Sequence, residues 1–121
     1  MKDKIEFSEF LEIEKKLEIR MGSIDGVERM EGSDKMLKMT VDFGEDYDSF
    51  LTVMTNIGNK PGLSEEGEEQ ELVGRTFPFI TNLKPVKMMG VESHAMIMLS
   101  ETPDGRIDGL DEDITPGAKI L

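Results

Sequence analysis

The sequence contains no cysteine, no tryptophan and only one histidine among its 121 residues. Without cysteine the chain can form no disulfide, no thiolate nucleophile and no cysteine-ligated zinc site. A Ser–His–acid triad would have to use His94, and no G-x-S-x-G motif accompanies it. These absences argue against an enzyme, and we predict no cofactor.

Long apolar segments are also absent. No run approaches the roughly 18–20 residues that a membrane-spanning helix needs, and residues 1–6 contain two acids and begin no signal-peptide core. We therefore expect a soluble, cytoplasmic protein with no membrane partner. Acidic residues cluster at 104–113, but their spacing does not match a calcium-binding loop, so no metal site is predicted.

Positive charge is scarce. The chain has 26 acidic residues against 14 Lys and Arg, which gives a formal net charge of −12. Nucleic-acid binders usually show the opposite balance, because Lys and Arg neutralise phosphates. Residues 72–91 nevertheless contain no acid and hold Arg75, Lys84 and Lys87. This distribution is compatible with a local basic face on an acidic molecule, and equally with ordinary scatter of three charges.

The hydrophobic periodicity indicates one helix followed by strands. Apolar residues at 7, 10 and 11 have helical spacing, and from residue 17 the period changes to two. The strands are predicted at 17–27 with a bulge or bend at Gly22, and at 37–43, 50–55, 75–83 and 95–99. Pro78 indicates an edge or an irregular part of its strand. Residues 56–70 and 84–92 read as loops, and 118–121 as a short extended piece.

Five short strands separated by turns predict an all-β domain. A closed five-stranded barrel with a short N-terminal helix and a C-terminal extension leaves no exposed strand edge in so short a chain. Periodicity alone also permits another small barrel or a sandwich.

Methionine is abundant, with ten residues in the chain. Methionine fills irregular gaps in cores and also forms adaptable binding surfaces. Met88 and Met89 lie in a predicted loop beside Lys84 and Lys87. An apolar pair next to basic residues could pack against an RNA base or against an apolar side chain of a peptide.

One segment resembles a known family. Residues 82–99 read N-L-K-P-V-K-M-M-G-V-E-S-H-A-M-I-M-L, and the family pattern is approximately N-L-K-P-R-K-L-M-G-V-E-S-x-G-M-I-L. Residues 18–24, 33–44, 71–75 and 116–120 resemble further family blocks in consistent order. The chain thus resembles, over 17–121, the tRNA-binding domain at the C-terminus of many bacterial methionyl-tRNA synthetases. The domain also occurs as a free-standing dimeric tRNA-binding protein and in a small dimeric secretion chaperone.

The resemblance implies an OB-fold barrel at 17–121, preceded by a helical extension at 1–16. It also implies recognition of tRNA, or of another structured RNA, by shape, alone or in trans with an aminoacyl-tRNA synthetase. The basic segment 72–91 contributes Lys84 as a candidate RNA contact, and the family's RNA-facing positions add Lys35, Asn82, Lys87, Ser93 and Met96.

Departures from the family pattern support an alternative function. Val86 replaces a family arginine, Ala95 replaces a glycine, and the loop at 65–71 is acidic. The alternative is a dimeric module that binds unfolded polypeptide through Met88 and Met89, like the secretion chaperone. In either case the resemblance predicts a homodimer through the chain ends. The helix residues Phe7, Phe10 and Leu11 and the tail Ile120-Leu121 could supply its contact.

Overall fold

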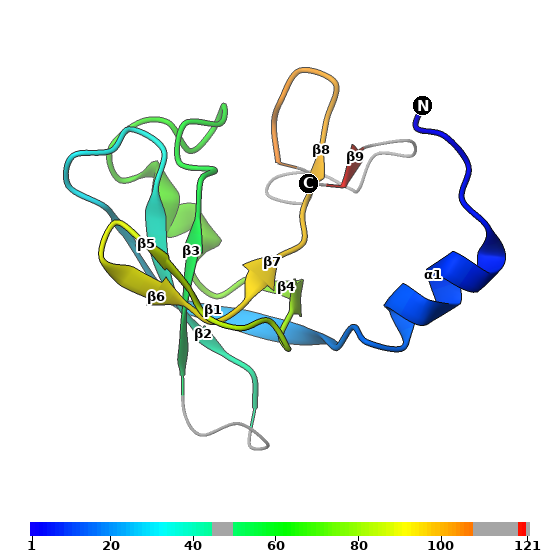
Figure 1. Ribbon diagram of the computed structural model, residues 1–121. Coiled ribbons are helices and arrows are strands. Elements are labelled where there is room, and N and C mark those ends of the chain that lie inside the picture. The colour runs from blue at the N-terminus through cyan, green and yellow to red at the C-terminus, as the bar shows by residue number, and fades with distance from the viewer. Residues whose placement is uncertain (45–49, 108–118, 121) are drawn as a thin grey trace.

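The computed structural model describes residues 1–44, 50–107 and 119–120. Its central element is a five-stranded antiparallel sheet with the strand order β3-β2-β1-β4-β7 (Figure 1). The strands are β1 (Ile19–Arg29), β2 (Leu37–Asp42), β3 (Leu51–Thr55), β4 (Thr76–Ile80) and β7 (Met96–Ile97).

The two edges of this sheet come together, so that the sheet nearly closes into a barrel. The N–H group of His94 donates to the carbonyl of Thr52 at 3.0 Å. The N–H group of Met54, on β3, donates to the Ser93 hydroxyl at 3.0 Å. These contacts join β3 to the chain just before β7, which confirms the predicted five-stranded barrel of the OB type.

A β-hairpin occupies the segment 84–92 that the sequence predicted to be a loop. It consists of β5 (Val86–Met88) and β6 (Val91–Ser93), which pair with each other. Met89 and Gly90 at its tip have φ values of 50° and 80°, and two positive φ values are typical of the turn that matches the strand twist. Three-residue strands are too short to produce a visible alternation, which is why the prediction was wrong here.

Three smaller elements complete the described chain. A 3₁₀ helix, η1 (Glu68–Leu72), lies between β3 and β4. Strands β8 (Ser100–Glu101) and β9 (Lys119–Ile120) pair with each other, so an extended piece near the C-terminus is confirmed for residues 119–120. Residues 108–113 of the predicted acidic loop, and Leu121, lie outside the described residues.

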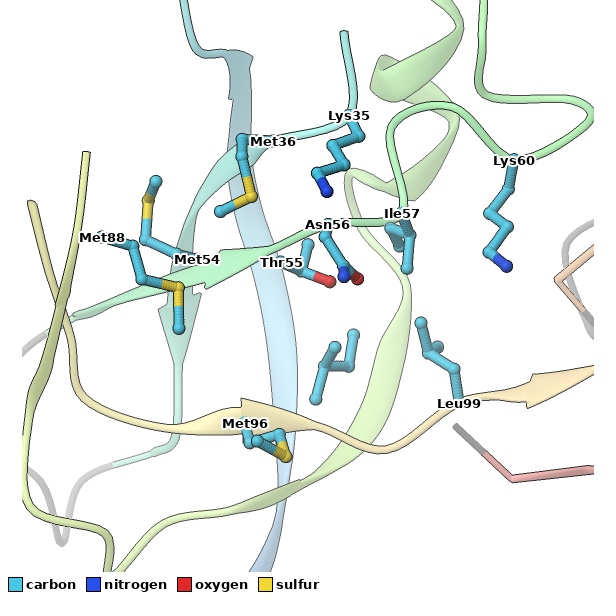
Figure 2. A pocket seen from close by; sticks show the side chains of 11 residues that line it. Lys35, Met36, Met54, Thr55, Asn56, Ile57, Lys60, Met88, Met96 and Leu99 are labelled. Carbon is cyan, nitrogen blue, oxygen red and sulfur yellow. The ribbon is translucent and has the colours of Figure 1, made fainter. Parts of the chain in front are cut away.

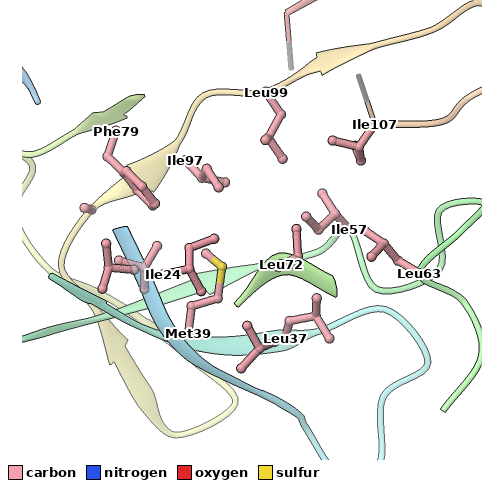
Figure 3. Close-up of a cluster of buried hydrophobic side chains, with 14 of the residues drawn as sticks. Ile24, Leu37, Met39, Ile57, Leu63, Leu72, Phe79, Ile97, Leu99 and Ile107 are labelled. Carbon is pink, nitrogen blue, oxygen red and sulfur yellow. The ribbon is translucent and has the colours of Figure 1, made fainter. Parts of the chain in front are cut away.

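The core fills the barrel, and β2 supplies much of it. Leu37, Met39 and Val41 are fully buried, as the alternation in residues 37–43 predicted. Ile57 and Leu63 from the segment after β3 join the same cluster (Figure 3). That segment, 56–70, was predicted to have little order, but its apolar side chains anchor it to the core.

Gly22 is required by close packing and does not form a β-bulge. A Cβ atom there would lie 2.6 Å from the Val41 side chain and 2.7 Å from the Phe43 ring, so only glycine lets β1 pack this closely. The irregularity in the β1–β2 ladder falls instead between Ile24 and Gly26. The predicted bulge was therefore placed too early in the strand.

Pro78 lies inside the sheet, because β4 pairs with β1 on one side and β7 on the other. The β4–β7 ladder covers only Phe79 and Ile80, and the Pro78 carbonyl accepts a hydrogen bond from Met98 at 2.9 Å. The edge interpretation was wrong. The proline stands where the ladder ends, which fits the irregular-strand interpretation.

The helix α1 (Phe7–Glu14) extends away from the barrel (Figure 1). None of its residues is buried, and Phe7 is 70% exposed. Among the described residues, no helix has both the length and the apolar character needed to cross a bilayer.

Candidate nucleic-acid interface

A groove of about 470 Å³ opens on one side of the barrel. Its walls come from the loop between β1 and β2, the end of β3 with the turn after it, and the β5–β6 hairpin together with β7 (Figure 2). In OB-folds the β2–β3 face and the loops on either side of it form the usual ligand surface. We call this feature the methionine groove. Its lining residues are Lys35, Met36, Met54, Thr55, Asn56, Ile57, Lys60, Met88, Met96, Ile97 and Leu99.

Lys35 stands at the rim of the methionine groove, and its backbone is fixed from two sides. The Ser33 hydroxyl accepts hydrogen bonds from the N–H groups of Lys35 at 3.3 Å and Met36 at 3.1 Å. The Lys35 carbonyl accepts one from the N–H group of Gly58 at 2.8 Å. The side chain is exposed, and it makes no ion pair with any described residue. Lys35 thus presents an unneutralised charge from a rigid base.

Gly58 allows this approach of two loops. A Cβ atom at position 58 would lie 2.8 Å from the Lys35 carbonyl oxygen, which is closer than a carbon and an oxygen can pack. A glycine at this point therefore fixes the distance between the loop that carries Lys35 and the turn after β3.

The groove carries a charge pattern unlike the rest of the molecule. Among the described residues that line it, two are lysines and none is acidic, although the chain has 26 acids. Lys60 is partly compensated, because its ammonium lies 3.0 Å from a carboxylate oxygen of Glu101. Lys35 is therefore the stronger attractant for an anion at this site.

Of the three methionines predicted to bind a partner, two line the groove and one does not. Met96 is 52% exposed and lines the groove, as does the half-buried Met88. Met89 is 47% exposed at the hairpin tip but does not line the groove. A residue other than glycine rarely adopts a positive φ such as that of Met89, and this backbone conformation costs about 1–2 kcal/mol.

The remaining predicted lysines lie outside the groove lining. Lys84 precedes the hairpin, and Lys87 lies on β5 opposite Glu92 of β6. Both side chains are exposed, and neither makes an ion pair within the described part of the chain. They add positive charge to the segment that contributes Met88 to the groove.

Asn82 is engaged with the chain that precedes β1. Its Oδ1 accepts a hydrogen bond from the N–H group of Glu18 at 2.8 Å, and its Nδ2 donates to the Lys16 carbonyl. The neighbouring Thr81 hydroxyl also donates to the Glu18 side chain at 2.7 Å. These bonds attach the linker after α1 to the end of β4.

Ser93 is buried, with 5% of its surface exposed. Its hydroxyl accepts from the N–H group of Met54 and donates to the Ala95 carbonyl at 3.1 Å. Both of its hydrogen-bonding functions are thus used in closing the barrel.

Sequence reasoning missed part of the site. Asn56 and Lys60 follow β3 in a segment that was predicted to be a loop with little order, and Met36, Met54 and Thr55 were not predicted as site residues. The signal that could have found them is the apolar pair Ile57 and Leu63, which is unusual in a solvated loop.

A second polar cluster holds the segment after β3 in place. The Arg29 guanidinium donates to the carbonyls of Gly58 at 2.9 Å, Glu65 at 2.9 Å and Leu63, and to the Glu69 carboxylate. We call this the Arg29 cluster. Burial raises the pKa of Glu69, but hydrogen bonds from the Gly67 N–H, the Gln70 amide, its own N–H and Arg29 outweigh burial and lower it below the ordinary value.

Metal binding finds no support in the described ranges. No three side chains of the His, Cys, Asp or Glu type gather there closely enough to hold an ion.

Comparisons with known proteins agree on one family. Residues 19–119 match the family model described as "Putative tRNA binding domain". A methionine–tRNA ligase of Methanocella arvoryzae is 34% identical over 105 residues, which are 87% of this chain and 14% of that enzyme. The methionine–tRNA ligase of Archaeoglobus fulgidus is 32% identical over 122 residues, or 98% of this chain and 17% of the enzyme. The chain thus spans about one-sixth of the length of these relatives, or less.

Solved structures show the same fold. A protein related to methionyl-tRNA synthetase from Pyrococcus horikoshii superposes with a TM-score of 0.66 at 29% identity, covering 96% of this chain and 92% of that one. The CsaA chaperone protein of Picrophilus torridus gives 0.64 at 21% identity, covering 98% and 89%. The second likeness concerns the fold alone.

Proposed function

The chain belongs to the tRNA-binding domain family, and from this membership we propose that it binds tRNA, or another structured RNA, without catalysing a reaction. One observation supports a particular surface as the RNA-binding site. Lys35 presents an ammonium that pairs with no described carboxylate, at the rim of an apolar groove whose described lining contains no acid, on a molecule with a net charge of −12.

The charge distribution supports contact through one side of the barrel only. Lys35, Lys84 and Lys87 would each meet a phosphate as a point charge. The acidic remainder repels a polyanion, so it weakens binding in every other orientation and favours the one that presents these lysines.

Asn82 and Ser93 are proposed to act on RNA binding by positioning. Their hydrogen-bonding groups are already used within the chain, by the linker before β1 and by β3 respectively. Met96, in contrast, is exposed in the groove and is proposed to touch the RNA directly.

A synthetase is the proposed recipient of the bound tRNA, in the same chain or in trans. The relatives that share this domain are methionine–tRNA ligases. A domain that holds tRNA beside such an enzyme would raise the local tRNA concentration.

Salt-dependent binding tests the proposal. An unmodified tRNA transcript should bind saturably at 50 mM salt, and log affinity should fall linearly with log salt concentration. Lys35→Ala should reduce the magnitude of that slope by about one, because one phosphate contact is lost. Lys4→Ala, an exposed lysine in the segment before α1, serves as the matched control and should leave the slope unchanged. Absence of saturable binding at 50 mM salt contradicts the proposal.

A polypeptide-binding module is the alternative, and the exposed methionines favour it. Met88 and Met96 give the groove the soft apolar lining that suits peptide side chains. Such a module should slow the aggregation of an unfolded client protein, and Lys35→Ala should leave that activity unchanged.

We also propose that the protein forms a homodimer through α1. The helix exposes Phe7 and Phe10, whose stacked rings lie 6.1 Å apart, and no described residue covers them. A soluble protein seldom leaves such a face uncovered. Light scattering should give the mass of a dimer for the wild type and of a monomer for the double variant Phe7→Ser and Phe10→Ser. A wild-type monomer at micromolar concentration contradicts the proposal.

A further inference from the structure

We infer that the methionine groove receives one unpaired nucleobase of the RNA, and that the Asn56 amide reads the edge of that base. The inference rests on the proposed RNA-binding function. It adds to that function a preference for nucleotides that lie outside a double helix.

The size of the groove fits a single nucleotide. A volume of about 470 Å³ lies within the range of small-molecule sites. It is too small for a base pair with its two backbones, so an entering base has to be free of its partner. RNA loops and bulges supply such bases, and proteins recognise RNA sequence mainly there.

The lining suits the flat face of a base. The thioethers of Met54, Met88 and Met96 border the groove (Figure 2). Polarisable sulfur makes favourable contacts with aromatic rings. Flexible methionine side chains also adapt to a purine or a pyrimidine, so the methionines favour a base without selecting which one.

Asn56 supplies the polar group that an apolar lining lacks. Its amide points into the groove, beside Thr55 and below Lys35 in Figure 2. No described residue forms a hydrogen bond with it. The amide offers donors and an acceptor together, as base edges do, so one base can satisfy both.

The backbone around Asn56 is held in place before any ligand arrives. Thr55 is buried on one side, and Gly58 is bonded to the Lys35 carbonyl on the other. The Gly58 carbonyl is further held by Arg29 at 2.9 Å. With the backbone fixed, only the Asn56 side-chain torsions have to be ordered on binding, which favours recognition of a defined edge.

The charge of the groove favours a nucleotide over a peptide. Lys35 is placed to meet the phosphate next to the bound base, and none of the groove residues in the described ranges would repel that phosphate. A peptide side chain has no anion to offer at this position unless it is acidic, and an acidic side chain would find few partners among the methionines.

Two RNA probes with equal charge test the inference. The first is a 19-nucleotide hairpin with a fully paired stem and an unpaired seven-nucleotide loop. The second is the same hairpin with abasic loop sugars. The wild type should bind the first about tenfold more tightly, which is the upper end of the effect expected from methionine sulfur packed on an aromatic ring. Asn56→Ala should weaken binding of the first hairpin several-fold and leave the second unchanged. Asn56→Asp, which places a carboxylate near the phosphate, should weaken both and the first more strongly.

Asn59→Ala is the matched control, because Asn59 is an exposed asparagine three residues away that does not line the groove. It should bind both hairpins like the wild type. Equal wild-type affinity for the two hairpins would overturn the inference and leave RNA binding in place, whereas failure to bind either at 50 mM salt would overturn both. Tight binding of a neutral apolar heptapeptide, weakened by Asn56→Ala, would assign the groove to polypeptide and also overturn the inference.

Discussion

Arg29 and Lys35 both contact the turn after β3, yet they use their positive charges in opposite ways. The Arg29 side chain is 21% exposed, and its guanidinium binds three carbonyls and one carboxylate of the chain. Lys35 is exposed and binds no described carboxylate. A cation that is saturated by its own fold stabilises structure, and one that is left unsatisfied is free to bind a partner. The net charge of the chain does not tell these two kinds of cation apart.

The turn after β3 connects the two roles. The Gly58 carbonyl accepts a hydrogen bond from Arg29, and the Gly58 N–H group donates one to the Lys35 carbonyl. Substitutions in the Arg29 cluster should therefore change the free energy of unfolding, whereas substitutions in the methionine groove should change RNA affinity.

The largest effect is expected from Arg29→Ala. It leaves the buried Glu69 carboxylate without its cation and frees the carbonyls of Gly58, Leu63 and Glu65. Breaking a buried ion pair costs about 3–5 kcal/mol, and the partial exposure of Arg29 favours the lower end of this range. Urea unfolding measures the loss. Arg29→Lys should recover only a small part, because an ammonium cannot reproduce the guanidinium fork. A loss below about 1 kcal/mol would contradict the structural assignment of Arg29.

Ser93→Ala should be next, with a loss of about 2 kcal/mol. The substitution leaves the buried N–H group of Met54 without an acceptor, and an unsatisfied buried donor costs about 1–3 kcal/mol. Thermal or urea unfolding tests this, with the exposed Ser64→Ala as control. Full stability combined with a loss of tRNA affinity would instead place the Ser93 hydroxyl on the RNA surface.

Glu69→Gln should cost about 1 kcal/mol at pH 7, because a hydrogen bond to a charged group is stronger than one to a neutral group. The pKa of Glu69 is lowered in the folded state, so its charged form adds stability above the unfolded pKa of about 4.3. That stability is lost as the pH falls through the folded pKa. The difference between wild type and variant should therefore shrink below about pH 4. Urea unfolding at a series of pH values measures it, with the exposed Glu66→Gln as control.

The smallest effect on stability is expected from Lys35→Ala. An exposed side chain without an ion pair should change the free energy of unfolding by less than about 0.5 kcal/mol. The same variant should lose tRNA affinity. If its unfolding midpoint fell as far as that of Ser93→Ala, the contrast between Lys35 and Arg29 would not hold.

Strand β2 could be predicted most clearly, because its burial follows a period of two. Leu37, Met39 and Val41 alternate with polar residues, and all three are buried. The β5–β6 hairpin could not be predicted in this way, because each of its strands has only three residues and the turn begins with Met89 rather than with the usual Asn or Gly.

The site could be predicted only in part, because exposure and partners depend on packing between distant segments. Lys35, Met88 and Met96 are brought together in the groove as three elements of the chain meet there. The family resemblance singled out Ser93 and Asn82 as well, but their hydrogen bonds span 39 and 64 residues. No local pattern reveals such long-range partners.

The Arg29 cluster has a consequence for how this surface can be re-engineered. Since Arg29 binds both the Glu65 carbonyl and the Glu69 carboxylate, the exposed residue Glu66 lies between two attached positions. Extra residues inserted after Glu66 would lengthen only the stretch between them. New recognition elements could therefore be grafted there while the binding surface keeps its shape.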